Sequence, residues 1–534
     1  MKLIYGVKDK PGVGKTLLFA LQQLLAILAA TIAVPAIVGN GMSQSAALFG
    51  AGVGTIVYLL FTKFRSPVFL GSSFAFIGSM FAAFGGAASA AAGYVGLIIG
   101  AVFAGLVYVV IALIVKFAGV KWINKIMPAV VIGPTVAIIG LSLAGNAVGD
   151  LQATNYVQKY DPADYQIVVA SDYEIDDKGA YLFANPESTE ATAQTFVVDK
   201  DADLSKPVPA DKIHTEITAT IDDEGQVVSL TSVPGSVYVA LVCGIVTLAV
   251  TMLCSVYAKK TLKSIPFIIG ILAGYAVAAC FTLIGRATGN MSLMVIDFSA
   301  FSSMKWLPDF TFLQASKGLS DITPAFVGTV AVAYIPVAFV VFAEHIADHK
   351  NISSIIEKDL LEDPGLSRTL LGDGVGSMAG AFFGGCPNTT YGESIGCVAI
   401  SGNASIVTIL CTAIMAMVAA FIAPFVTFLA TIPKCVMGGV CIALYGFIAV
   451  SGLKMVQKVD LEDNRNLFVV SVILISGIGG LAVNFGKVTI TEVACALILG
   501  ILTNLMLAGC KKKEAVVEAV EEAAEEAVKE KTEE

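Results

Sequence analysis

The chain has 534 residues, of which 56% are hydrophobic and only 14% are charged, and its mean hydropathy is +0.81. Because soluble domains carry about 25% charged residues, this composition excludes a soluble globular protein and indicates a protein embedded in a membrane. The formal net charge of −9 comes from two polar segments: residues 151–234 carry −11 and residues 511–534 carry −4, which leaves the apolar body at +6.

Fourteen apolar runs, each bounded by charged residues, Pro or Gly, follow one another along the chain. They cover residues 16–38, 45–61, 68–84, 93–115, 127–148, 235–257, 264–285, 324–345, 369–385, 389–401, 404–430, 434–451, 466–483 and 489–509. A helix needs about 20 apolar residues to cross the hydrocarbon core of a bilayer. The sequence therefore predicts an all-α polytopic membrane protein with about 14 transmembrane segments.

Two of these runs are atypical, because residues 70–84 and 389–401 are short and rich in Gly and hydroxyl side chains. Non-helical backbone at membrane depth is tolerated only where it is buried in protein or lines a cavity. In transporters, interrupted segments in corresponding positions of two halves indicate the binding site. The two broken runs are seven runs apart, as are the similar stretches Met127–Gly133 and Ile432–Gly438. A unit of seven spans re-enters the membrane upside down, so we expect a 7+7 inverted repeat with short broken segments 3 and 10.

The basic residues predict how the chain is oriented, because cytoplasmic loops carry an excess of Lys and Arg. On an even count of spans, most of the loop Lys and Arg residues fall on one side. These are Lys63, Arg65, Lys116, Lys121, Lys125, Lys259, Lys260, Lys263, Lys454, Lys458 and Lys511–Lys513. We expect both termini in the cytoplasm and residues 151–234 on the outer side of the cell membrane.

The polar insert at residues 151–234 contains stretches in which apolar and polar residues alternate, at 165–170, 180–184 and 213–221. Asp/Gly turns at 176–179 and 222–225 separate them. This pattern predicts a small β-rich extracellular insert. We interpret it as a solvated decoration, with a binding or assembly module as the alternative. The charged tail at 511–534 is interpreted as a solvated cytoplasmic appendage.

Two glutamates, Glu344 and Glu393, lie in strongly apolar surroundings. A carboxylate at membrane depth costs about 2.5–3.5 kcal/mol on insertion scales, so it is usually retained only where it faces a cavity, a partner or a substrate. Glu344 and Asp348 are four residues apart and share one face of a helix. Neighbouring carboxylates hinder each other's ionisation, so the sequence predicts that Glu344, Asp348 and His345 take up and release a proton. The alternative is that the residues from His345 onward are polar groups at a helix end in the headgroup region.

In the second broken run, Pro387 and Gly392 interrupt the helix beside Glu393 and free backbone N–H and C=O groups. A carboxylate with neighbouring amides can form paired hydrogen bonds with a planar donor–acceptor edge, such as the imide edge of a pyrimidine. Phe74 in the first broken run could supply an aromatic wall and further backbone groups. We therefore predict a substrate site where the two broken runs meet.

Three motifs, Gly71-Ser-Ser-Phe-Ala-Phe76, Ala343-Glu-His-Ile346 and Pro387-Asn-Thr-Thr-Tyr-Gly-Glu393, carry a family resemblance. Together they resemble the uracil permeases of the nucleobase–ascorbate transporter family, the xanthine/uracil permeases. The resemblance extends over the whole chain except the insert and the tail. It implies that Glu344 and Glu393 bind the base through their side chains and that Phe74 and Gly392 bind it through their backbones. It also implies that Tyr391 lies beside the site, that Glu344 takes part in proton coupling and that the protein forms a homodimer.

The resemblance also implies a fold with a core domain (segments 1–4 and 8–11) and a gate domain (segments 5–7 and 12–14). On this scheme the chain divides into residues 1–150 (core segments 1–4 and gate segment 5), 151–234 (the insert), 235–323 (gate segments 6–7 and an outer loop), 324–430 (core segments 8–11), 431–510 (gate segments 12–14) and 511–534 (the tail). The chain departs from the family pattern at three places: Ser394 stands where Asn is usual, Ser401-Gly402 where Thr-Arg is frequent, and Asp348 where some uracil permeases have His.

The function expected from these features is proton-coupled uracil symport by alternating access, with the proton as coupling ion and no other cofactor. All ten cysteines lie in or beside apolar runs and none forms a CxxC pair, so neither a disulfide framework nor a metal site is expected. Four alternatives stay open: a xanthine or urate permease of the same family, an anion transporter of similar architecture, a membrane-embedded hydrolase and a receptor built on the insert. The enzyme alternative is disfavoured because no Ser or Cys is placed to pair with His345 or His349.

Overall fold

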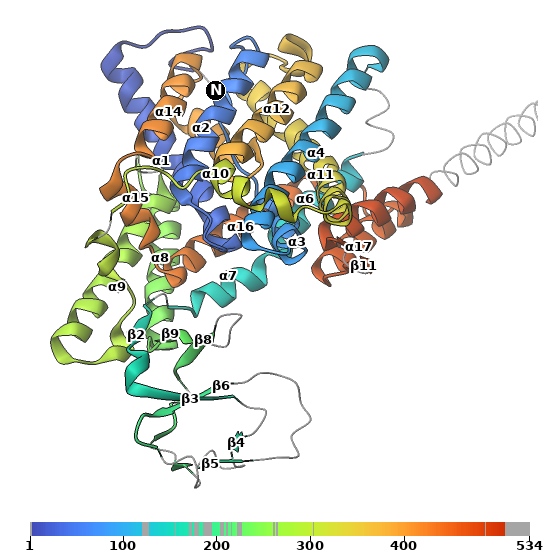
Figure 1. Ribbon diagram of the computed structural model, residues 1–534. Coiled ribbons are helices and arrows are strands. Elements are labelled where there is room, and N and C mark those ends of the chain that lie inside the picture. The colour runs from blue at the N-terminus through green and yellow to red at the C-terminus, as the bar shows by residue number, and fades with distance from the viewer. Residues whose placement is uncertain are drawn as a thin grey trace, which may run out of the picture.

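Figure 1 shows the computed structural model of the protein. The structure describes residues 3–507 except 120–127, 155, 170–172, 176–180, 185–194, 203–207, 210–211, 215, 222–226, 260–261, 263–264, 303 and 486–487. The predicted tail and the two predicted Asp/Gly turns of the insert lie outside the described residues.

The described residues are mostly helical, as the composition predicts. The α-helices are α1 (Val13–Val38), α2 (Gln44–Phe61), α3 (Ile77–Gly85), α4 (Ala90–Ala118), α6 (Ala129–Ser142), α7 (Ala144–Leu151), α8 (Val237–Tyr257), α9 (Pro266–Thr288), α10 (Thr311–Ala315), α11 (Pro324–Ile356), α12 (Leu366–Gly384), α13 (Gly392–Ser401), α14 (Ile406–Ala419), α15 (Ala423–Ala430), α16 (Lys434–Val456) and α17 (Asn464–Ile478). A further apolar helix covers Glu492–Leu507. Outside the insert the strands are β1 (Leu70–Ser72), β10 (Asn388–Thr390), β11 (Val483–Phe485) and β12 (Val488–Ile490).

Eight of the described helices are long and apolar enough to cross a membrane, or nine if α14 and α15, which meet at 83°, form one bent span. This number supports a multi-pass membrane protein, but it is smaller than the predicted fourteen. The difference arises because several predicted runs contain helices too short to cross alone, such as the 10 residues of α13 and the 15 residues of α17. The fourteen-segment inverted repeat therefore stays a prediction.

Helix α11 is longer than the apolar run that predicts it. It begins after Thr323, whose side chain accepts a hydrogen bond from the backbone N–H of Phe326, and continues for 33 residues to Ile356. His345, Asp348 and His349 therefore lie inside the helix and not at its end. This corrects the alternative interpretation, since His345 and His349 have no exposed surface at all.

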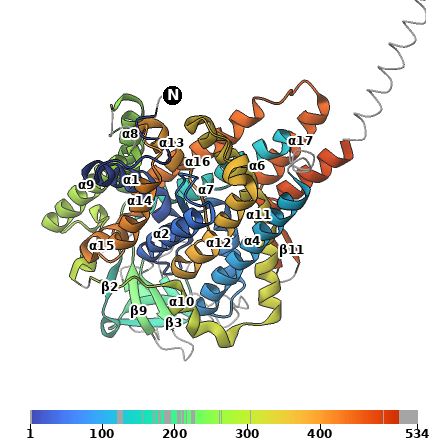
Figure 2. The same ribbon diagram turned by 90° about the horizontal axis from the view of Figure 1, so that it is seen from above.

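Helices α2, α4 and α12 lie side by side, with α12 in the middle (Figure 2). Glycines line both contacts of α12. A Cβ atom at Gly50 of α2 would lie 2.4 Å from the carbonyl oxygen of Gly380, and one at Gly105 of α4 would lie 2.8 Å from that of Gly374. Small residues at helix contacts allow backbones to approach closely within a membrane, so these glycines fix how near α12 lies to both neighbours.

The two broken segments pair with each other although more than 300 residues separate them. Strand β1 runs antiparallel to β10, with Gly71 opposite Thr389. The Asn388 side chain adds a bond outside the ladder, because its Nδ2 donates to the carbonyl oxygen of Gly50 at 3.1 Å. Each strand leads into a short helix: β1 into a 3-10 turn (Phe74–Phe76) and α3, and β10 into α13. The predicted breaks in segments 3 and 10 are thus present and meet inside the protein.

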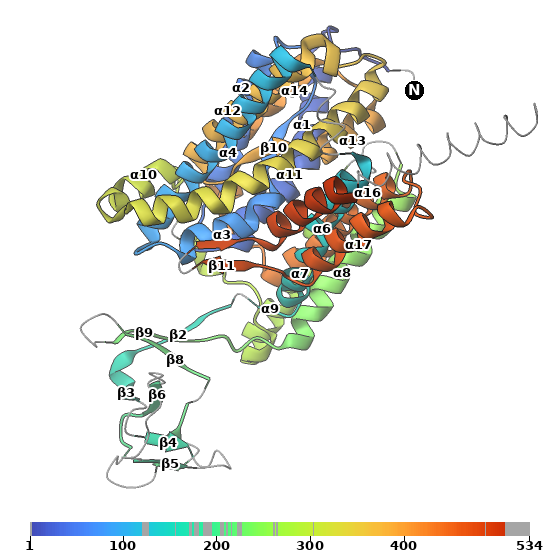
Figure 3. The same ribbon diagram turned by 90° about the vertical axis from the view of Figure 1, so that its right-hand side faces the viewer.

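A second group of helices forms around α16, which packs against α6 and α8, while α6 also contacts α17 and α8 contacts α9. In the side view of Figure 3 these helices lie together on one side, and α2, α4, α12 and α14 lie on the other. The division of the chain into core and gate segments stays a prediction.

The insert forms a separate lobe at the end of the helical body opposite the N-terminus (Figures 1 and 3). Its strands are β2 (Gln158–Tyr160), β3 (Tyr165–Val169), β4 (Tyr173–Ile175), β5 (Tyr181–Ala184), β6 (Thr195–Asp199), β7 (Val208–Pro209), β8 (Thr218–Ile221) and β9 (Val227–Ser232). All pairings among them are antiparallel. The alternating pattern therefore predicts this part of the chain correctly, and its small core of Val197, Ile217 and Leu230 is separate from the main core.

Candidate functional site

The crossing of the two broken segments places short helices beside a cavity of about 380 Å³. Phe74 and Ala75, just before α3, line this cavity, as do Gly392 and Glu393 in the first turn of α13. The first N–H groups of a helix have no partner inside it and carry a partial positive charge. The backbone of these segments is therefore suited to bind the carbonyl oxygens of a ligand.

Helix α11 contributes a row of side chains to the same cavity. Glu344, Ala347, Asp348 and Asn351 all line it, and their spacing of three or four residues puts them on one face of the helix. The two carboxylates are partly exposed to the cavity. Asp348 is held in place because the hydroxyl of Thr390, on β10, donates to its Oδ2 at 2.7 Å.

Helix α13 brings the third carboxylate, Glu393, and two glycines that leave space around it. A Cβ atom at Gly392 or Gly396 would meet no atom within 4 Å. The neighbouring residue, Ser394, points the other way and is fully buried, where its Oγ accepts from Nε2 of Gln23 at 2.5 Å and from the backbone N–H of Phe69 at 3.2 Å. Ser394 therefore ties α13 to α1 and leaves Glu393 facing the cavity.

Two aromatic residues complete the predicted set. The Tyr391 hydroxyl donates to the carbonyl oxygen of Ser72 at 2.7 Å, so its ring lies across the start of the other broken segment. The Phe74 ring meets Tyr445 of α16 edge-on, with ring centroids 5.6 Å apart. Phe74 thereby lies where the two groups of helices face each other, on the wall of the cavity.

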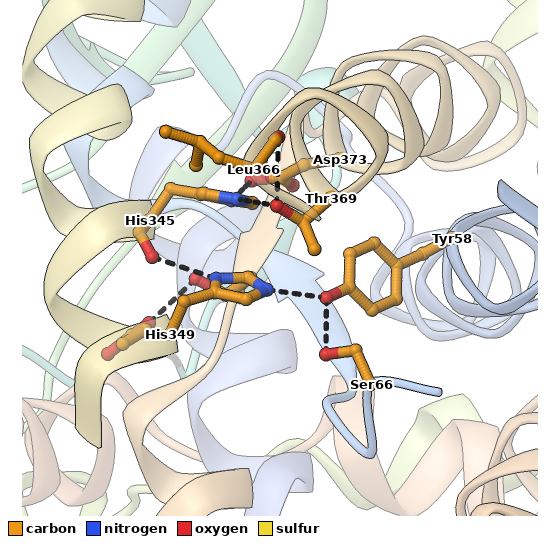
Figure 4. Close-up of polar contacts among 9 residues, drawn as sticks. Tyr58, Ser66, His345, His349, Leu366, Thr369 and Asp373 are labelled. Atoms are coloured by element: carbon orange, nitrogen blue, oxygen red, sulfur yellow. Dashed lines mark hydrogen bonds and ion pairs between the residues drawn. The ribbon is translucent and has the colours of Figure 1, made fainter. Parts of the chain in front are cut away.

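Six of the seven residues predicted from the sequence therefore line one cavity, namely Phe74, Glu344, Asp348, Tyr391, Gly392 and Glu393. His345 does not line it. Its ring points toward α12, where Nδ1 lies 2.7 Å from Oδ2 of Asp373 and Nε2 lies 3.0 Å from the hydroxyl of Thr369 (Figure 4). The side chain of His345 is therefore not in contact with the cavity that holds its neighbour Glu344.

The cavity also contains residues that the sequence did not single out. Ser255 at the end of α8, Phe267 at the start of α9, and Phe447 and Ser451 on α16 line it. No Lys or Arg is among the described residues that line the cavity, so three acidic side chains face it without a basic neighbour. Asp373 is a further buried carboxylate that was missed. It is the only ionisable residue in the run 369–385, which is a usable signal for function.

The comparison with known proteins identifies relatives over nearly the whole chain. The profile of the xanthine/uracil permeases, described as the "Permease family", matches residues 14–170 and 225–485. The uracil permease of Bacillus caldolyticus is 34% identical over 513 residues, covering 95% of each chain. That of Bacillus subtilis is 33% identical, covering 96% of this chain and 97% of the relative, and that of Escherichia coli K12 is 30% identical, covering 94% and 93%. These relatives are named as permeases, which agrees with the expectation that the chain is not an enzyme.

Solved structures with a similar fold come from more distant proteins. The transmembrane domain of the cyanobacterial bicarbonate transporter BicA has a TM-score of 0.53 at 14% identity, and the match covers 92% of this chain and 96% of BicA. The murine anion transporter Solute Carrier 26 family member A9, in the inward-facing state, has a TM-score of 0.57 at 12% identity, with 94% and 69% covered. At such identities the likeness concerns the fold alone.

Proposed function

Because this chain belongs to the xanthine/uracil permease family, we propose that it imports uracil, or a closely related nucleobase, across the cell membrane together with a proton. The observation that carries the proposal is the single cavity that gathers Glu344, Glu393 and the backbone of both broken segments. Uracil is a flat ring whose edge alternates N–H donors and carbonyl acceptors. Carboxylate oxygens accept from the N–H groups, and the free N–H groups near Phe74 and Gly392 donate to the carbonyl oxygens.

The proton is assigned to the acidic face of α11. In this proposal Glu344 is protonated when the site faces outward, hydrogen-bonds the base and loses its proton when the site faces inward, and Asp348 holds a second negative charge close by. No Lys or Arg is among the described residues that line the cavity, and its three carboxylates repel one another when all are ionised. A proton bound together with a neutral base relieves this repulsion, which supports symport over uniport.

Alternating access is supported by where the cavity leads. From Glu344 it continues along α11 to Asn351, and it reaches Ser255 at the end of α8 and Met455 near the end of α16. Lys454 lies in the last turn of α16, and Lys259 and Lys458 lie in the loops that follow α8 and α16. These basic residues are predicted to be cytoplasmic. We propose that this is the inward-facing arrangement, with both termini in the cytoplasm, the insert outside and the helices around α16 serving as the gate.

Anion transport is one alternative, because both proteins with a similar fold are named as transporters of anions. The cavity argues against it, because an anion would approach three carboxylates and no described Lys or Arg. A xanthine or urate permease is the closer alternative. It predicts that excess unlabelled xanthine prevents uptake of labelled uracil, whereas the proposal predicts little competition.

Uptake of radiolabelled uracil into vesicles, driven by an imposed pH gradient, tests the proposal. We expect uptake by the wild type, its loss when a protonophore is added, and its loss in Glu344→Gln and Glu393→Ala. Glu492→Gln is the matched control, because Glu492 is a partly buried carboxylate that does not line the cavity. Normal uptake in either Glu344→Gln or Glu393→Ala would refute the assigned site.

A further inference from the structure

Behind the acidic face of α11 lies a buried polar network that the proposed transport cycle does not use. It joins His345 and His349 of α11 to Thr369 and Asp373 of α12 and to Tyr58 of α2 (Figure 4). Each of these side chains is at most 1% exposed. Buried polar groups are costly unless they are hydrogen-bonded, so a network of this size at the centre of a helix bundle calls for a function.

The sequence of α11 separates two rows of residues. Positions 344, 347, 348 and 351 line the cavity, whereas His345, His349, Ile352 and Ile356 are buried against other helices. Successive residues are about 100° apart around an α-helix with 3.6 residues per turn. A rotation of α11 by one residue would therefore carry the histidines toward the cavity and the carboxylates into the bundle.

The apolar part of α11 carries no pattern that selects one face for the cavity, since the helix is apolar on nearly every side between Phe326 and Ala343. The polar network does depend on the rotation, because its hydrogen bonds are directional. His345 Nδ1 lies 2.7 Å from Asp373 Oδ2, and His349 Nε2 lies 2.7 Å from the hydroxyl of Tyr58. One helix is thus bonded to α12 and to α2 through side chains four residues apart.

The hydrogen-bond partners define the donor roles of His345. Thr369 donates its only hydroxyl hydrogen to the carbonyl oxygen of Leu366 at 3.0 Å, so Nε2 of His345 must be the donor to Thr369. The hydrogen between Nδ1 and Asp373 is then shared by the pair, which is neutral as a whole. A neutral pair avoids an isolated charge among buried helices.

The two histidines also support each other. Their rings stack with centroids 4.0 Å apart and planes at 27°, and Nδ1 of His349 donates to the carbonyl oxygen of His345 at 2.8 Å. The Tyr58 hydroxyl is also hydrogen-bonded to Ser66 Oγ at 2.7 Å, which connects the network to the loop after α2. The whole arrangement is a single connected set, so losing one member weakens the hold of the others.

We propose that His345 and His349, with Asp373 and Tyr58, are positioning residues that fix the rotation of α11 and so hold Glu344 and Asp348 toward the substrate. The inference rests on the proposed function only for its effect on uptake; the rotation itself can be measured without any substrate.

The measurement uses two neighbouring positions of α11 as probes. Asn351→Cys places a thiol on the cavity row and Ile352→Cys places one on the buried row, and each is labelled with a water-soluble maleimide in inside-out vesicles. The same chain without an added cysteine gives the background from the native thiols. With the network intact, we expect Asn351→Cys to react and Ile352→Cys to be protected.

Two variants then remove the network with little loss of volume or charge balance. Tyr58→Phe deletes one hydroxyl, and the double variant His345→Leu/Asp373→Leu removes both partners of the neutral pair together. In each of these variants, we expect the difference in labelling rate between cysteines at positions 351 and 352 to become much smaller than with the network intact. Tyr334→Phe is the matched control, since Tyr334 lies on the same helix and its buried hydroxyl has no partner among the described residues.

Transport gives the second readout through a double-mutant cycle. If Tyr58 acts through the acidic face, Tyr58→Phe raises the KM for uracil. In the double variant with Asp348→Asn, we expect the fold-increase in KM to be at least about twofold smaller than the product of the two single fold-increases, as is typical of coupled residues. If the difference in labelling rate between positions 351 and 352 is unchanged in both network variants, the inference is overturned, whichever substrate the protein transports. Absence of uracil uptake by the wild type would contradict the proposed function. The labelling result alone would then decide the inference about the rotation of α11.

Discussion

Gly71 and Tyr391 show how one missing side chain shapes the candidate site. A Cβ atom at Gly71 would lie 2.3 Å from Cε2 of Tyr391. The tyrosine cannot move aside easily, because its hydroxyl bonds the carbonyl oxygen of Ser72 and its backbone N–H bonds that of Phe69 at 3.2 Å. We expect Gly71→Ala to displace the ring together with Gly392 and Glu393, to abolish uracil uptake and to cost about 1–3 kcal/mol of stability, as overpacking does.

Uptake in vesicles and the unfolding temperature in detergent test this expectation. Gly328→Ala is the control, because a Cβ atom there meets nothing within 4 Å. An uptake rate for Gly71→Ala equal to that of Gly328→Ala would show that the position of the Tyr391 ring is unimportant.

At the scale of elements, α13 is attached to its neighbours by the side chain of Ser394. Ser394 accepts from the side chain of Gln23 on α1 and from the backbone N–H before β1. Ser394→Ala leaves both buried donors without this acceptor, which costs about 1–3 kcal/mol. We expect a lower unfolding temperature in detergent. Ser316→Ala, which removes an exposed hydroxyl, should leave that temperature unchanged, and equal effects of the two variants would contradict the role of Ser394.

The insert carries a second testable contact, between strand β6 and the loop that follows β7. His214 Nε2 lies 2.7 Å from Oδ1 of Asp199, and Nδ1 lies 3.4 Å from Glu216. The hydrogen bond with Asp199, and to a smaller extent that with Glu216, raises the pKa of His214 above its usual value of 6.5, although partial burial opposes the shift. The charged form therefore stabilises the folded insert at pH values below 6.5, and this contribution is lost as the pH rises through the raised pKa.

Limited proteolysis of the insert checks the sign of this effect. We expect slower cleavage at about pH 5.5 than at about pH 8.5, because His titrates within this range. His214→Gln should reduce the difference, since glutamine stays neutral at both values. A larger difference in the variant than in the wild type would contradict the assignment.

At the scale of the whole molecule, the insert and the helical body have separate cores, and the chain leaves and re-enters the body at nearly the same place. A Cβ atom at Gly235 would lie 2.4 Å from Oγ1 of Thr154, so the two ends can be joined by a short linker. We expect deletion of residues 155–230 to leave uracil uptake intact. Full-length protein in the same vesicles is the reference, and loss of uptake with normal membrane insertion would favour a binding or assembly role for the insert.

The sequence alone was enough to predict a membrane protein, its mostly helical content, the two broken segments and five of the residues that share the cavity, whereas Tyr391 came from the family resemblance. The sequence could do so because each of its signals is local. A carboxylate in an apolar run costs energy wherever the run lies, and Pro387 and Gly392 interrupt a helix whatever surrounds it. The number of spans does not follow from such local signals, because the length of an apolar run does not distinguish a crossing helix from a half-length one such as α13.

Only the tertiary structure decided which way the side chains of α11 face. Glu344 and His345 are neighbours in an apolar run, and the run offers no amphipathic pattern that would assign one to the cavity and the other to the bundle. That choice depends on Asp373 and Tyr58, which are distant in sequence and meet the histidines only after α2, α11 and α12 have packed. The pairing of β1 with β10 is decided in the same way, since two three-residue strands have no partner until the folded chain brings them together.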